Sequence, residues 1–172
     1  MARIAWCLLL ATVLCVPVGA QSADPFYGLW KLDLVASEFS TERPPKAEFL
    51  VIGPDKAGLS FRVTMVDYRG DLGGLRSVVP HDGSDGDVVA FFPADRREGM
   101  SGVRLYAAPW LDKMTFEWLG PRSARAVFRK GDHVRLTVDA TVDATGRTMT
   151  WEQTGRDFDA REFGDRLVFR KP

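Results

Sequence analysis

The longest regular alternation of apolar and polar side chains in this chain is the stretch Val134-Arg135-Leu136-Thr137-Val138-Asp139-Ala140-Thr141-Val142. Apolar side chains occupy every second position, and charged or hydroxyl-bearing side chains fill the positions between them. Successive side chains of a β-strand point to opposite faces of its sheet, so this pattern predicts a strand with one buried and one solvated face. One-sided burial is typical of antiparallel sheets.

Similar alternation recurs along most of the chain. Groups of turn-forming residues, such as Gly53-Pro54-Asp55 and residues 143–147, separate the alternating stretches, and no stretch has the period of an amphipathic helix. Residues 33–45 predict a loop or a short helical turn, and residues 93–112 predict an irregular segment that contains one short strand. The expected strands are 26–32, 48–52, 59–68, 75–79, 88–92, 103–106, 113–119, 124–128, 134–142, 149–151 and 167–169.

Many short strands joined by turns predict an all-β fold, which is either a sandwich or a closed barrel. A closed barrel is favoured because closure leaves no sheet edge exposed. We therefore expect a single antiparallel β-barrel of about eight to ten strands, with no domain boundary between residues 21 and 172.

Residues 1–20 predict a cleavable secretory signal peptide. Met1-Ala2-Arg3 is basic, residues 4–16 form an uncharged apolar run, and Val18-Gly19-Ala20 supplies the small residues that a signal peptidase requires. The apolar run is shorter than the roughly 20 residues of a membrane span. We expect residues 21–172 to form an exported domain, in the periplasm or outside the cell, without a stable membrane span.

Composition argues against several functional classes. Cys7 and Cys15 both lie in the expected signal peptide, so residues 21–172 offer neither a disulfide nor a thiol. The chain has 23 basic and 23 acidic side chains and no basic cluster, so we expect no nucleic-acid partner. Its only histidines, His81 and His133, are too few for a histidine-rich metal site or a catalytic triad. We expect no metal and no cofactor.

The segment Phe26-Tyr27-Gly28-Leu29-Trp30-Lys31-Leu32 resembles the first strand of the lipocalin superfamily, which opens with Gly-x-Trp. The chain more closely resembles a group of uncharacterised exported bacterial proteins with a predicted lipocalin-like, calycin-type β-barrel. Their pattern is Gly-x-Trp-Lys-Leu-Asp, then Ser-x-Phe, then Pro-Pro-Lys. The matching positions here are Gly28, residues 30–33, Ser37, Phe39, residues 44–46, residues 146–150, Thr154, Gly155 and residues 167–169.

The resemblance implies a lipocalin-like barrel rather than a particular activity. In lipocalins the tryptophan of this motif plugs the closed end of the barrel beneath a basic side chain. The resemblance therefore implies structural roles for Gly28, Trp30 and Arg170, with either Arg166 or Arg170 above the Trp30 ring. An arginine over an indole face contributes about 0.5–2 kcal/mol.

Inward positions of the expected strands carry large apolar side chains. A barrel of this size either holds one small ligand or fills with side chains, and the sequence leaves both alternatives open. A ligand pocket would be apolar, with a few polar groups that fix the orientation of the ligand. The expected lining residues are Phe61, Met65, Phe116, Trp118, Phe128 and Trp151.

Three other features are weaker candidates for a site. The acidic stretch 82–87 lacks the ligand spacing of an EF-hand and favours an ordinary turn. The charged run 156–165 predicts either a solvated connection between the last two strands or a lid over the barrel mouth. Glu117 and Glu152 have the chemistry of general acids or bases, but the alternation places both on the outward face.

The sequence favours an exported binding protein for a small, largely apolar ligand. One alternative is a barrel enzyme of isomerase, cyclase or lyase type, which requires a titratable side chain inside the barrel. The other is a structural or interaction module with a filled core, which an exposed apolar patch around residues 93–112 would favour.

Overall fold

A computed structural model describes residues 24–40, 43–91, 111–156 and 161–172 of the chain. These residues form ten β-strands and no helix, so none of them belongs to a helix that is long and apolar enough to span a membrane. The strands are β1 (Gly28–Leu32), β2 (Ala47–Asp55), β3 (Gly58–Val66), β4 (Leu72–Pro80), β5 (Gly86–Phe91), β6 (Lys113–Gly120), β7 (Ser123–Lys130), β8 (His133–Val142), β9 (Thr148–Arg156) and β10 (Glu162–Arg170).

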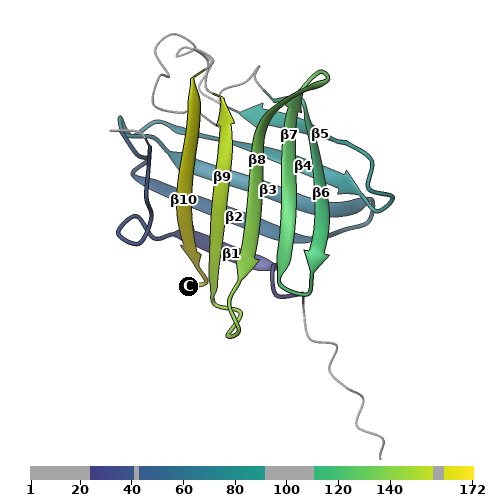
Figure 1. Ribbon diagram of the computed structural model, residues 1–172, viewed down its shortest axis with the longest axis horizontal. Coiled ribbons are helices and arrows are strands. Elements are labelled where there is room, and N and C mark those ends of the chain that lie inside the picture. Colours follow the sequence, from purple (N-terminus) through teal and green to yellow (C-terminus); the bar gives the residue numbers. More distant parts are fainter. Residues whose placement is uncertain (1–23, 41–42, 92–110, 157–160) are drawn as a thin grey trace, which may run out of the picture.

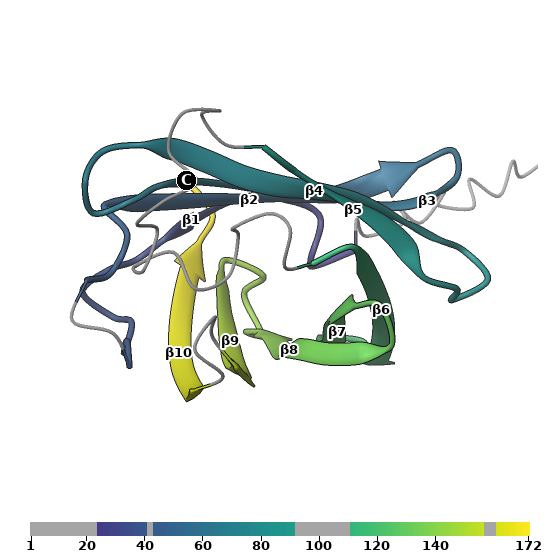
Figure 2. The same ribbon diagram turned by 90° about the horizontal axis from the view of Figure 1, so that it is seen from above.

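The ten strands close into one antiparallel barrel. Each strand pairs with its neighbours in the sequence, and β1 completes the ring by pairing with both β2 and β10. In Figure 1, β6 to β10 stand upright in front of β1 to β5, which cross behind them, and Figure 2 shows the same two layers from above. The all-β prediction of a single barrel of eight to ten strands is confirmed.

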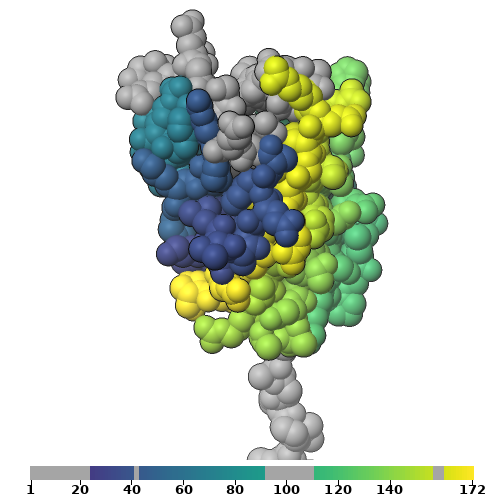
Figure 3. All heavy atoms as spheres, turned by 60° about the vertical axis from the view of Figure 1, so that its left-hand side comes forward, coloured from purple at the N-terminus to yellow at the C-terminus, as the bar shows by residue number. Residues whose placement is uncertain are grey.

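Two seams join the layers, and both are short. The first seam is the pairing of β1 with β10 and the second is the pairing of β5 with β6. Only two residue pairs join the strands at each seam, whereas nine join β2 to β3. At the first seam Glu38 forms a bridge to Arg166, and the chain that follows β1 packs against β10, as Figure 3 shows. The paired residues are Lys31 with Arg170 and Leu32 with Phe169 at the first seam, and Gly86 with Met114 and Asp87 with Lys113 at the second.

Most strands are longer than the alternation predicted. The last two expected strands, 149–151 and 167–169, are in fact β9 and β10, which pair over nine residues from Thr148 with Arg170 to Arg156 with Glu162. The interpretation of 156–165 as a connection or a lid is wrong for Arg156 and for residues 162–165, which belong to these strands. The expected strand at 103–106 lies outside the described residues.

The interior of the barrel holds one apolar core. The core faces of β7 and β8 follow the predicted alternation, because Ala124, Ala126 and Phe128 are buried on β7, and Leu136 and Val138 on β8. The intervening residues face outward, where an ion pair joins Arg125 to Asp139 at 2.6 Å. The core is therefore built from the inward face of every strand.

Candidate functional site in the barrel interior

Trp30 is buried beneath Lys171, the residue that follows β10. Its side chain is 0% exposed, and its Nε1 donates a hydrogen bond of 2.8 Å to the carbonyl oxygen of Phe26. The ammonium group of Lys171 lies 4.5 Å from the centre of the Trp30 ring and donates to the carbonyl oxygen of Pro25 at 3.0 Å. Burial lowers the pKa of Lys171, against the opposing attraction of Asp24. We call Phe26, Trp30 and Lys171 the end plug.

The prediction that Arg166 or Arg170 covers Trp30 is wrong, because both point outward. Along β10 the inward side chains of Phe163, Leu167 and Phe169 are buried, whereas Arg166 and Arg170 lie on the other face of the strand and are exposed. Arg170 Nε instead donates to Asp33 at 2.7 Å, and this bond holds the pKa of Asp33 below its usual range. Gly28 lies beside the end plug with a φ of 125°, and a Cβ there would be 3.7 Å from the Lys171 stem.

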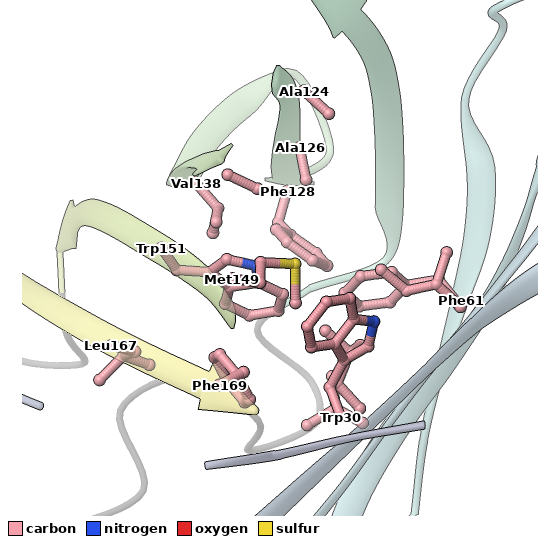
Figure 4. Close-up of a cluster of buried hydrophobic side chains, with 14 of the residues drawn as sticks. Trp30, Phe61, Ala124, Ala126, Phe128, Val138, Met149, Trp151, Leu167 and Phe169 are labelled. Carbon is pink, nitrogen blue, oxygen red and sulfur yellow. The ribbon is translucent and has the colours of Figure 1, made fainter. Parts of the chain in front are cut away.

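Four aromatic side chains meet in the middle of the barrel. Phe61 on β3 stacks on Trp151 of β9 with ring centres 6.1 Å apart, and Phe128 of β7 meets Phe61 edge-on at 6.0 Å. Phe169 of β10 packs on Trp151 at 4.8 Å. Figure 4 shows these rings converging between the two layers. We call Phe61, Phe128, Trp151 and Phe169 the aromatic layer.

The structure divides the six predicted lining residues into two groups. Phe61, Phe128 and Trp151 belong to the aromatic layer, and Met65 is buried nearby in the same core. Phe116 and Trp118 instead pack edge-on against each other at 4.8 Å, and both contact Phe26 of the end plug. Trp118 is 44% exposed, so it lies at the rim of the barrel rather than in its centre.

Three uncharged residues each bury a side-chain polar atom that has no hydrogen-bond partner among the described residues. The atoms are Trp151 Nε1, Gln153 Oε1 and Ser77 Oγ, and their residues are 3%, 2% and 4% exposed. Trp151 and Gln153 are consecutive inward residues of β9, and Ser77 on β4 pairs with Phe61 of the aromatic layer. Buried polar side-chain atoms in folded proteins nearly always have partners, so these three mark a polar margin of the aromatic layer.

Asp165 fixes the orientation of the Gln153 side chain. Gln153 and Asp165 are direct partners across β9 and β10, and Gln153 Nε2 donates to Asp165 Oδ2 at 2.9 Å. The other carboxylate oxygen of Asp165 accepts hydrogen bonds from Ser40 N at 2.6 Å and Ser40 Oγ at 2.5 Å. A carboxylate only accepts, so the amide nitrogen of Gln153 must face Asp165 and its oxygen must face away.

Our sequence analysis missed the polar residues of the interior. Glu48 is 2% exposed on β2, where it shares the inward face with Leu50 and Ile52. Gln153 and Asp165 likewise continue the inward alternation of Trp151 and Leu167. The alternation of inward and outward positions along each strand was enough to identify all three residues as inward-facing. The apolar alternation alone ends at Trp151 and begins at Leu167, so it does not reach Gln153 or Asp165.

The remaining candidates lie on the surface. Glu117 and Glu152 are exposed, on the outward face as expected. Asp82 closes a turn by accepting hydrogen bonds from Ser84 Oγ at 2.6 Å and Ser84 N at 2.9 Å, and these bonds lower the pKa of Asp82. Within the described part of the chain, no group of three or more His, Cys, Asp or Glu side chains is arranged to hold a metal ion.

Comparisons of the chain with protein-family models, with curated proteins and with solved structures found no match.

Proposed function

We propose that this chain is an exported binding protein that holds one small, largely apolar molecule inside its barrel. The observation that carries this proposal is the margin of the aromatic layer, where Trp151, Gln153 and Ser77 bury polar atoms that lack partners among the described residues. Ligand pockets combine apolar walls with a few such polar groups. A core that serves packing alone would satisfy or omit them, because a buried unpaired polar atom destabilises the fold.

The aromatic layer supplies the apolar part of the proposed site. Its rings come from both layers of the barrel, and the end plug lies on the side where β10 ends. Gln153 and Asp165 lie toward the opposite end, where β9 ends and β10 begins. We therefore place the ligand between the aromatic layer and that opposite end.

Export is supported by the sequence of residues 1–20, which has the order of a secretory signal peptide. The absence of cysteine from residues 21–172 suits an oxidising compartment, because no free thiol is available for unwanted disulfide exchange. This part of the proposal predicts that the protein from its native host begins at Gln21, which N-terminal sequencing by mass spectrometry would test.

Ligand binding is testable with N-phenyl-1-naphthylamine, a neutral apolar probe whose fluorescence rises when it leaves water. We expect saturable binding of one probe molecule per chain, together with a rise in the melting temperature that increases with probe concentration. An unchanged melting temperature with no saturable fluorescence, for this probe and for a panel of apolar compounds, would refute the proposed function.

A further inference from the structure

We infer that the ligand carries a hydroxyl group, which donates a hydrogen bond to Gln153 Oε1 and accepts one from Trp151 Nε1. This inference rests on the proposed function and adds the polar chemistry of the ligand to it. It follows from the hydrogen-bonding character of two adjacent inward side chains on β9, both of which are more than nine-tenths buried.

The Gln153 amide has only its buried oxygen left for a further hydrogen-bond partner. Its nitrogen donates to Asp165 Oδ2 at 2.9 Å, and Ser40 holds that carboxylate in place through hydrogen bonds of 2.6 and 2.5 Å from N and Oγ. The amide cannot rotate to offer its nitrogen without placing its oxygen against the carboxylate. A partner for Gln153 Oε1 must therefore be a hydrogen-bond donor.

Trp151 offers a hydrogen-bond donor, whereas Gln153 offers an acceptor. An indole nitrogen is a donor only, so a partner for Trp151 Nε1 must accept a hydrogen bond. The stacking of Trp151 between Phe61 and Phe169 fixes the plane of its ring and hence the direction of its N–H. Consecutive inward residues of a strand have Cα atoms about 7 Å apart, so the two side chains are neighbours on the inner wall of the barrel.

A hydroxyl group both donates and accepts through a single oxygen atom, which matches this pair. An ether oxygen accepts but cannot donate, and an ionised carboxylate has the same limitation. A carboxylate would also lie close to the negative charge of Asp165, which disfavours it further. The pair therefore selects an apolar alcohol over an ether or a fatty-acid anion of the same size.

Displacement of N-phenyl-1-naphthylamine by two isomers, 1-decanol and nonyl methyl ether, tests this inference. Both compounds have the same atoms and nearly the same apolar surface, but only the alcohol can donate. We expect 1-decanol to displace the probe at a concentration about tenfold lower than the ether does, which is the effect of one buried hydrogen bond. Decanoate is expected to resemble the ether or to compete less well.

Two variants assign the effect to its residues. Gln153→Met removes the acceptor and should abolish the advantage of the alcohol, while displacement by the ether stays nearly unchanged. Trp151→Phe keeps an aromatic ring but removes the donor, so it should weaken alcohol and ether alike. Glu152→Met, the same replacement at the exposed neighbouring position, is the matched control and should change neither.

The outcomes separate this inference from the proposed function. Failure of the unmodified protein to bind the probe overturns both. Probe binding with equal displacement by alcohol and ether, or an alcohol advantage that survives in Gln153→Met, overturns the hydroxyl assignment alone and leaves an apolar binding protein.

Discussion

Lys171 reaches the indole ring of Trp30 because it follows the last residue of β10. Phe169 points inward, so the alternation turns Arg170 outward and brings Lys171, two residues after Phe169, back to the inward side. The expectation of an arginine over Trp30 came from a family resemblance. Leu167 and Phe169 alternate with the two arginines along β10. Because the apolar residues point inward, the sequence alone was enough to exclude both arginines from the position above Trp30.

The contacts of the end plug predict that replacing Lys171 destabilises the protein more than replacing its neighbour Arg170. We expect Lys171→Met to lower the free energy of unfolding by about 1 kcal/mol, because it removes the cation–π contact and the hydrogen bond to Pro25. Arg170→Met removes only a surface ion pair with Asp33, which contributes about 0–1 kcal/mol, and should cost less. Urea unfolding of both variants is the measurement, and a larger loss for Arg170→Met would contradict the assignment.

The low pKa of Asp143 predicts how much stability the β8–β9 turn contributes as the pH falls. Burial opposes its ionisation, but hydrogen bonds from Thr145, Thr148 and Arg147 outweigh burial and lower the pKa of Asp143 to about 2. A carboxyl whose folded-state pKa is depressed stabilises the fold fully above its unfolded pKa, which is about 3.9. That contribution is lost as the pH falls through the folded value of about 2.

The stability difference between the unmodified protein and Asp143→Asn should therefore be largest at neutral pH and shrink between about pH 4 and pH 2. Thermal unfolding over this range measures it. Asp132→Asn, the same replacement at an exposed position in the β7–β8 turn, serves as the control. A difference that stays constant down to pH 2 would show that the Asp143 carboxylate is not specifically stabilised.

At the scale of elements, the sequence predicted where strands lie better than where they end. Alternating apolar residues located all ten strands of the described chain. The end of β9 and the start of β10 were missed because polar residues occupy inward positions there, as with Gln153 and Asp165, and exposed charges flank them. The ion pair of Arg156 with Glu162 at 2.9 Å joins those two strand ends, so the charges that suggested a loop belong to paired strands.

We expect two glycines of the layer formed by β1 to β5 to respond differently to replacement by alanine. A Cβ on Gly74 of β4 would run into the carbonyl oxygen of Val63 and lie 2.8 Å from the ring of Phe91, whereas Gly53 of β2 has nothing within 4 Å. We expect Gly74→Ala to lower the free energy of unfolding by about 1–3 kcal/mol through overpacking. Gly53→Ala should be neutral or stabilising by up to about 0.5 kcal/mol, since alanine loses less chain entropy.

Equilibrium unfolding in urea compares the two glycine variants. If both variants lose the same free energy of unfolding, β3 and β4 are not as close together at Gly74 as the structure describes. A gain for Gly74→Ala would lead to the same conclusion.

At the scale of the whole molecule, two short seams hold two layers around one interior. The sequence predicted the barrel and the inward positions of Phe61, Phe128 and Trp151, because these follow from local alternation. It did not predict the pairing of Ser40 with Asp165, which are 125 residues apart, because nothing in the sequence near Ser40 marks a distant partner. The orientation of Gln153 depends on that contact, so the polar character of the interior also required the structure.

If the barrel interior binds a small apolar molecule, a variant that fills the interior should lose that binding. Ala90 of β5 faces the core, while its neighbour Val89 is 49% exposed on the outer face. We predict that Ala90→Trp folds, keeps its free energy of unfolding within about 1 kcal/mol and no longer binds N-phenyl-1-naphthylamine, whereas Val89→Trp binds it normally. Unaltered probe binding by Ala90→Trp, or its unfolding by overpacking, would contradict binding in the interior.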